Sequence, residues 1–276
     1  PAPGRGAVVL GMGSLGAGRL NAGSDLDLIV IYDADGVEAS TGPKPLAARP
    51  YFARLTQAMV TALTAQMPEG RLYEVDMRLR PFGEAGPLAI SFAAMEDYYQ
   101  HHGRNWERYA MVKARVLGPQ CEHAMALTEL LRPFVFRRYI DFGVIDGLRQ
   151  MKAMIAAEVR RKGLEGNIKL GAGGIREVEF IAQAFQLIHG GRDLSLQQRP
   201  LLKVLATLEG QGYLPPAVIA ELRDGYEFLR YTEHAIQAIA DRQTQMLPDS
   251  PEDQARIAFM LGFVDWAAFH ERLMYW

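Results

Sequence analysis

One run of residues most constrains the fold of this chain: an apolar stretch, a glycine-rich turn, and a second apolar stretch that opens with two aspartates. The turn reads Gly11-Met12-Gly13-Ser14-Leu15-Gly16, and the second stretch runs from Asp25 to Asp33. Side chains in a β-strand alternate between two faces, so Asp25 and Asp27 lie on the same face. Beyond Asp27 both faces are apolar, which predicts a strand buried inside a sheet.

Two carboxylates side by side at the buried end of a strand repel each other and lose favourable hydration. A divalent cation between them removes both penalties, and hard cations such as Mg²⁺ prefer carboxylate oxygen. We therefore expect Asp25 and Asp27 to bind Mg²⁺ or Mn²⁺. The alternative is that they are solvated acids at the start of a strand.

A third acid lies in another alternating run, residues 71–80, in which one face is apolar and the other is charged. The charged face of such a strand is usually just exposed to solvent and has no further role. Beside the first strand, however, Asp76 would complete a three-carboxylate metal site, with Arg78 and Arg80 available for phosphate. That set of groups is typical of phosphoryl or nucleotidyl transfer.

Dinucleotide binding is a competing interpretation. The glycines at 11, 13 and 16 spell G-x-G-x-x-G after an apolar run, and Asp33 ends the next strand, where a ribose-binding acid is sought. Only residues 17–24 separate Gly16 from Asp25. A parallel crossover needs about a dozen residues. The spacing therefore favours two antiparallel neighbours.

Composition limits the class of protein. The chain has 276 residues and a net charge of −2, so it has no bulk electrostatic attraction for nucleic acid. The single cysteine, Cys121, excludes an internal disulfide and fits a reducing, cytoplasmic compartment. No apolar run has the length of a membrane span. The abrupt start at a predicted strand and the end at Trp276 suggest a fragment of a longer chain.

The pattern changes after Gly118-Pro119. Before it, strands alternate with helices predicted at 51–67 and 105–117. After it, helical periodicity dominates, beginning with a long helix over 133–160. We therefore expect an α+β domain over residues 1–117 and an all-helical bundle over residues 118–276.

A second glycine-rich stretch, residues 169–180, leads from a loop into a helix. Glycines let backbone N–H groups approach an anion, and a helix start adds favourable partial charge. We expect a phosphate contact here, from Lys169, Gly173, Gly174 and Arg176. An ordinary flexible helix entry explains the pattern equally well.

The motifs resemble a known family. Gly13-Ser14, ten residues, then Asp25-Leu26-Asp27 fits the pattern of polymerase-beta-type nucleotidyltransferases. The wider match is to the glutamine synthetase adenylyltransferase/adenylyl-removing enzyme family. It spans nearly the whole chain and rests on the stretches GMGSLGAGRLNAGSDLDLIVIYD, YEVDMRLRPFGEAGPL, DYYQHHGRNWERYAMVKARV, RPFVFRRYIDF and NIKLGAGGIREVEF.

The resemblance implies a mixed sheet, metal-binding acids at Asp25, Asp27 and Asp76, and a nucleotide-phosphate loop at Gly13 and Ser14. It implies glutamine synthetase as protein substrate, with ATP, AMP, ADP and inorganic phosphate as reactants or products. Family members have two similar halves and respond to the signalling protein PII, which we expect to act through the rest of a full-length chain. Ser14 departs from the family pattern, which usually has lysine there, so one phosphate contact is expected to be weaker.

The direction of the reaction follows from the same resemblance. Residues 82–246 are similar to the adenylyl-removing half, which implies phosphorolytic removal of AMP from a tyrosine of glutamine synthetase, giving ADP. The first eighty residues also resemble adenylylating halves, so ATP-dependent adenylylation is the alternative. A further alternative is a nucleotide-sensing regulatory module without turnover.

Overall fold

The chain forms two compact units, each described here by itself. Residues 1–20 and 24–139 make up the first unit, and residues 21–23 and 140–276 the second. The computed structural model describes residues 6–21, 23–33, 39–41, 43–119, 121–138, 142–164, 166–239 and 243–276.

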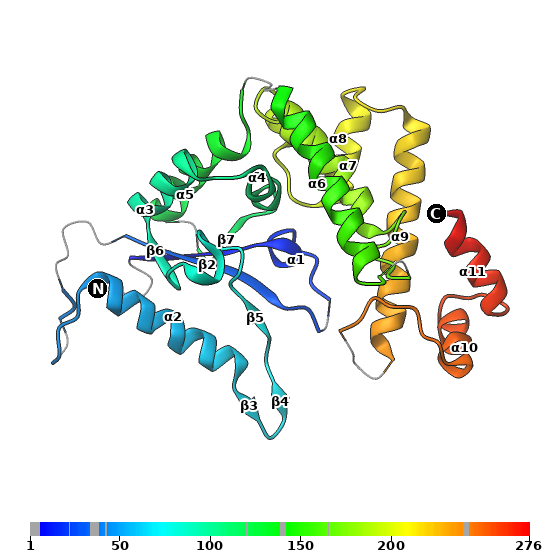
Figure 1. Cartoon of the computed structure of the whole chain (residues 1–276), viewed down its shortest axis with the longest axis horizontal. Helices are drawn as coiled ribbons and strands as arrows, with labels where there is room; N and C mark the ends of the chain where they lie inside the picture. The colour runs from blue at the N-terminus through cyan, green and yellow to red at the C-terminus, as the bar shows by residue number, and fades with distance from the viewer. Residues whose placement is uncertain are drawn as a thin grey trace. The chain divides into compact units, whose positions relative to one another are not determined.

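A mixed sheet organises the first unit (Figure 1). Strand β1 (Ala7–Gly11) pairs antiparallel with β2 (Leu26–Tyr32) on one side and with β7 (Arg115–Leu117) on the other. The free edge of β2 pairs in parallel with β5 (Val75–Asp76) at one end and with β6 (Ala89–Ser91) further along. The predicted α+β class with a mixed sheet is confirmed.

The antiparallel pairing of β1 and β2 excludes the dinucleotide-binding interpretation. In that fold the glycine-rich turn leads through a helix into a parallel strand. Here Leu10 faces Ile29 across an antiparallel ladder, and helix α1 (Gly13–Gly16) is a single turn. The short spacer between the glycine turn and the acids therefore correctly predicted antiparallel neighbours.

Strand β2 is the centre of the core. Ile29 and Ile31 are fully buried, whereas Val30 and Tyr32 point to the opposite face. Tyr32 stacks on Phe52 of α2 (Ala48–Thr64), with ring centroids 4.6 Å apart. Figure 1 shows α2 on one side of the sheet and α3 (Phe92–His101), α4 (Asn105–Met111) and α5 (Glu122–Val135) on the other. A small hairpin, β3 (Gln66–Met67) with β4 (Gly70–Arg71), follows α2.

Two predicted helices are interrupted. The helix predicted over 105–117 ends at Met111, and its last residues form β7 against β1. The long helix predicted from Pro133 is two helices, α5 and α6 (Phe142–Arg161), and residues 139–141 lie outside the described part of the chain.

A buried arginine explains where α5 ends. The Arg108 guanidinium, 1% exposed, donates from Nε to the Phe134 carbonyl at 3.0 Å and from Nη2 to the Val135 carbonyl at 3.1 Å. These carbonyls would otherwise accept helical N–H groups four residues later. The pattern of apolar residues continues through this point and gave no sign of the break.

The described residues of the second unit form helices joined by loops, with an isolated bridge between Asn167 and Met246 as their β-pairing. Helix α7 and the helices that follow it supply most of the apolar core of this unit. The core includes the fully buried Leu196, Leu208 and Phe269. Its remaining helices are α7 (Ile175–His189), α8 (Leu201–Gly210), α9 (Pro216–Ala238), α10 (Pro251–Met260) and α11 (Trp266–Tyr275). No helix in the described residues is both long and apolar enough to cross a membrane.

The division between the units differs from the predicted boundary after residue 117. Helix α5 packs against α3 and α4, which keeps residues 122–135 in the first unit. The loss of strand patterns after Gly118 marks a change of secondary structure, whereas the compact unit continues to residue 139.

The glycine turn provides a test of this packing. In Gly16→Ala the added Cβ would lie 2.1 Å from the Lys113 carbonyl oxygen and 2.6 Å from that of Gly11. Both obstacles are backbone atoms, so we expect a loss of about 1–3 kcal/mol or more in the free energy of unfolding. Urea unfolding followed by circular dichroism measures it. Gly210→Ala, whose Cβ meets nothing within 4 Å, is the control and should be neutral or slightly stabilising. Equal stability of the two variants would contradict the packing described.

Candidate active site at the start of strand β2

The first two acids lie at the entry to β2. Asp27 is the second residue of the strand and Asp25 precedes it, so both carboxylates lie on one face. Both are half-buried, and Asp27 lies between the buried Leu26 and Leu28. Asp25 Oδ1 is buried and has no hydrogen-bond partner among the described residues. An unpaired buried carboxylate oxygen is costly, which makes this a site that a cation would stabilise.

The third acid is the register neighbour of Asp27. Strand β5 runs parallel to β2, with Asp27 opposite Asp76. Adjacent strands lie about 4.8 Å apart, so these two side chains emerge next to each other. The register of β2 and β5 therefore places Asp27 and Asp76 side by side, with Asp25 at the start of the same strand, whereas their role as metal ligands stays a prediction.

Asp76 is engaged by Arg78. The arginine donates from Nε at 2.9 Å and from Nη2 at 2.6 Å to Asp76 Oδ2, and its backbone N–H donates to Oδ1 at 2.8 Å. The described residues contain no group of three histidine, cysteine, aspartate or glutamate side chains that could hold a metal ion as they stand. Carboxylate oxygens are the ligands that Mg²⁺ and Mn²⁺ prefer, so these acids fit such a cation chemically, and the metal site stays a prediction.

The ion pair sets the protonation state of Asp76. The side-chain hydrogen bond from Arg78 holds the pKa of this carboxyl below its usual value, although burial acts in the opposite direction. Smaller contributions come from the backbone N–H of Arg78 and from the charges of Arg78 and Arg80. The hydrogen bond from Arg78 therefore favours the ionised form of Asp76.

The glycine turn packs directly on Asp27. Gly13 has φ +51°, and a Cβ there would lie 2.4 Å from Asp27 Oδ2. The Met12 N–H donates to the Asp27 carbonyl at 2.9 Å. Only glycine allows the backbone to come this close to the carboxylate. Ser14, the next residue, is the second residue of the helical turn α1.

An arginine that the sequence interpretation missed holds this turn from its other end. Arg115 on β7 donates from Nη2 to the Leu15 carbonyl at 2.9 Å and from Nε to the Gly16 carbonyl at 3.2 Å. Arg115 lies about 100 residues from the turn in the sequence, so no local pattern indicated this contact. The pairing of β7 with β1 brings it into place.

Arg80 points into its own turn. Its guanidinium donates to the carbonyls of Met77 at 2.7 Å, Glu84 at 3.1 Å and Gly86 at 3.3 Å. These bonds give Arg80 a role in shaping residues 81–86. Its predicted phosphate contact stays a prediction, with Arg78 the more exposed of the two.

The second glycine-rich loop uses its own donors. The N–H of Gly173 donates to the Glu177 carboxylate at 3.3 Å, and those of Gly174 and Arg176 donate to loop carbonyls at 3.0 Å. The buried Asn167 side chain accepts the N–H groups of Lys169 and Leu170, both at 3.0 Å. The backbone amides that suggested an anion site are therefore satisfied within the loop.

The side chains of that loop belong to the helical unit. Lys169 Nζ lies 4.0 Å from Glu233, a buried acid on α9 that also pairs with Arg230. Arg176 is exposed. Lys169, Gly173, Gly174 and Arg176 are thus a separate feature from the acids of the sheet, and their phosphate contact stays a prediction.

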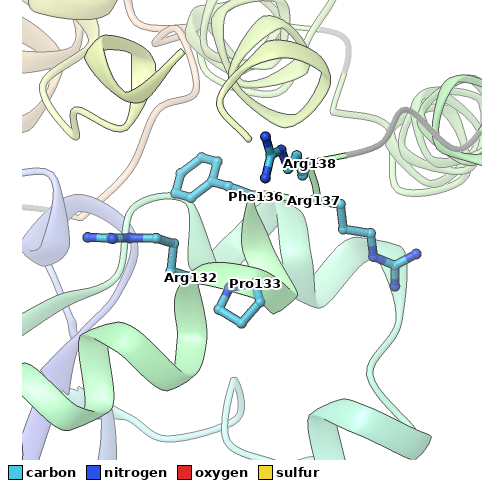
Figure 2. A pocket seen from close by; sticks show the side chains of 5 residues that line it. All are labelled: Arg132, Pro133, Phe136, Arg137 and Arg138. Atoms are coloured by element: carbon cyan, nitrogen blue, oxygen red, sulfur yellow. The ribbon is translucent and has the colours of Figure 1, made fainter. Parts of the chain in front are cut away.

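One pocket was not predicted. It has a volume of about 540 Å³ and lies at the end of α5, within the stretch RPFVFRRY. Figure 2 shows its lining, with the Arg132 and Arg137 side chains pointing to opposite sides of Pro133 and Phe136. Arg138 completes it. The arginines diverge, so the pocket is basic but has no convergent anion site. The repeated arginines of this stretch were the sequence feature that could have indicated the pocket.

Comparison with known proteins decides the family. The chain is 65% identical over 269 residues to the bifunctional glutamine synthetase adenylyltransferase/adenylyl-removing enzymes of Pseudomonas putida, Pseudomonas syringae pv. tomato and Pseudomonas aeruginosa. Residues 2–130 match the family model of glutamate-ammonia ligase adenylyltransferase. The chain belongs to the glutamine synthetase adenylyltransferase/adenylyl-removing enzyme family.

The match covers 98% of this chain but 27% of each of these relatives. Residues 149–275 additionally match the family model described as GlnD PII-uridylyltransferase, so the helical unit resembles a region found with a second kind of nucleotidyltransferase. The adenylyltransferase model ends within α5, close to the end of the first unit. The acids Asp25, Asp27 and Asp76 all lie inside the region that it matches.

The Asp76–Arg78 pair can be tested in the metal-free protein. In Arg78→Met we expect the pKa of Asp76 to rise toward its usual value, because the guanidinium that stabilises the ionised form is gone. The pair stabilises the fold above the unfolded-state pKa, and this contribution is lost as pH falls through the lowered folded pKa. The stability difference between wild type and variant should therefore shrink on acidification.

Carbon-detected NMR titration of the side-chain carboxyls measures this pKa. Arg71→Met is the matched control, since it removes an exposed pair with Glu74 on the same segment. It should leave the titration of Asp76 unchanged. An Asp76 pKa that is the same in wild type and in Arg78→Met would contradict the arrangement.

Proposed function

We propose that this chain catalyses metal-dependent nucleotidyl transfer on glutamine synthetase. The observation that carries the proposal is the pairing of Asp27 with Asp76 across parallel strands, with Asp25 on the same face and the Gly13 turn against the Asp27 carboxylate. Three acids beside a glycine turn suit a metal-bound nucleotide phosphate. The names of the curated relatives point to the same class of reaction.

Asp25, Asp27 and Asp76 would hold Mg²⁺ or Mn²⁺, which supplies neutralisation of charge on the phosphoryl oxygens when bound. The backbone at Gly13 and Ser14 would position the nucleotide phosphate. Arg78 has a second part in this proposal. When Asp76 turns to the metal, the Arg78 guanidinium is released and becomes available to a phosphate oxygen.

For direction we propose removal of AMP from the modified tyrosine. Inorganic phosphate attacks the AMP phosphorus, a new phosphorus–oxygen bond forms, and the bond to the tyrosine oxygen breaks. The tyrosine oxygen takes up a proton, and the other product is ADP. The support is the similarity of residues 82–246 to the removing half. The phosphate would be held by Arg78.

The opposite direction is the second candidate. There the tyrosine attacks the α-phosphorus of ATP and pyrophosphate leaves, and the same three acids serve. We further propose that PII acts on regions beyond these 276 residues, since the chain spans about a quarter of the length of its relatives. Binding of nucleotide without any metal-dependent product would instead indicate a sensing module.

Asp25→Asn and Asp27→Asn test the metal-binding acids. Each variant should lower metal-dependent turnover by about 100-fold or more, because each removes an anionic ligand. The melting temperature without metal should be unchanged or raised, since repulsion between the acids is relieved. Asp224→Asn, at an exposed position on α9, is the control and should retain full turnover. Near wild-type turnover in Asp27→Asn would refute the assignment.

The direction is tested by product analysis. With adenylylated glutamine synthetase, Mg²⁺ and inorganic phosphate, the proposal predicts release of ADP and of unmodified synthetase. The parallel reaction contains unmodified synthetase, Mg²⁺ and ATP. Pyrophosphate release and labelling of the synthetase there, without ADP in the first reaction, would show that the direction is reversed.

A further inference from the structure

Phe82 combines features that the fold alone does not explain. It is the one non-glycine residue with a positive φ among those the structure describes, at φ 63° and ψ 8°. Its large apolar side chain is 54% exposed. Left-handed backbone favours glycine or asparagine, and a bulky residue there is strained. Strain of this kind is found where a side chain has a functional task.

The turn around Phe82 is built to maintain that conformation. Arg80 binds three carbonyls of residues 77–86, as described above. The Gly83 N–H donates to the Arg80 carbonyl at 2.8 Å, which opens the short 3₁₀ helix η1 (Gly83–Ala85). Gly86 closes the turn, since a Cβ there would lie 2.1 Å from the Pro81 carbonyl oxygen.

A hydrogen-bonded pair, Tyr98 and Glu107, lies next to the turn, since the Tyr98 ring contacts the Phe82 ring. The Tyr98 hydroxyl donates to Glu107 at 2.8 Å, and Glu107 also accepts the Arg104 N–H at 2.8 Å. The pKa of Tyr98 is raised, first by burial and then by this bond, whereas a backbone hydrogen bond from Phe82 acts in the opposite direction. The Phe82 ring meets the Tyr98 ring at 67°, with centroids 4.5 Å apart. The ring is thus fixed in direction while about half of it remains open.

The turn lies beside the acids. Phe82 follows Asp76 by six residues in the segment that leaves β5. Arg80 donates to the Met77 carbonyl at 2.7 Å and to the Gly86 carbonyl at 3.3 Å, so the turn folds back onto the residue that follows Asp76. This compact turn joins the third acid to the exposed Phe82 ring, which places the ring in the same segment as the candidate phosphate site.

We propose that Phe82 is a binding residue for the nucleotide, and that its exposed ring stacks on the adenine base. The inference rests on the proposed function. Base–aromatic stacking suits this position because it needs an exposed π-face and a ring held in a fixed direction. The strained backbone provides that direction.

Two ligands separate stacking from phosphate binding. AMP carries the base, and ribose 5-phosphate lacks it but keeps the phosphate. Isothermal titration with Mg²⁺ should show tighter binding of AMP to the wild-type chain. In Phe82→Asn, AMP should bind about 5- to 150-fold more weakly, while ribose 5-phosphate binds as before. Asparagine tolerates left-handed backbone, so the fold should be retained and the melting temperature unchanged or raised.

Two further variants complete the test. Phe82→Trp keeps an aromatic ring and should keep the preference for AMP over ribose 5-phosphate. Phe259→Asn removes an exposed phenylalanine on α10 and should change neither affinity.

Four results would overturn the proposal. An unchanged AMP affinity in Phe82→Asn would do so, as would equal weakening of both ligands, which indicates a distorted phosphate site. Failure of both ligands to bind the wild-type chain in a metal-dependent manner would overturn this proposal together with the proposed function. Metal-dependent binding of both ligands with no preference for AMP would overturn this proposal alone.

Discussion

The structure depends on how carboxylates are accommodated where a fully buried strand begins. Strand β2 has neighbours on both edges and apolar side chains on both faces, so its first residues form the boundary between core and solvent. Asp25 and Asp27 lie at that boundary, with Asp76 beside them. Bringing three acids together is unfavourable for folding. The sheet register nevertheless places the three residues at one edge, which is the basis of the proposed cation site.

The fold offsets this repulsion without a metal through Arg78. Its guanidinium neutralises Asp76, keeps it ionised, and lies mostly in solvent, so it is free to move. Asp25 keeps an unpaired buried oxygen. The same groups therefore describe two states. In one, Asp76 pairs with Arg78. In the other, proposed for catalysis, Asp76 binds metal and Arg78 binds phosphate. In both states Asp76 faces a positive charge and Arg78 faces a negative one.

Sequence reasoning succeeded where a pattern was local. The bounds predicted for β2 from its apolar run agree with the structure, and the spacing after Gly16 correctly predicted antiparallel pairing. It failed where a distant residue decided the outcome. The end of α5 is set by Arg108, and the three-residue strand β7 was hidden in a helical pattern. The phosphate seat proposed at residues 169–176 was argued from available N–H groups, but loop carbonyls and side chains occupy those groups, which no periodicity reveals.

The central claim is that Asp25, Asp27 and Asp76 form one metal site. A crystal structure with Mn²⁺ and AMP, with anomalous scattering to locate the metal, tests it most directly. The account predicts an anomalous peak bonded to all three carboxylates and to a phosphate oxygen, with Asp76 turned away from Arg78. A metal bound elsewhere, or a peak that contacts Asp25 and Asp27 while Asp76 stays paired with Arg78, would contradict it.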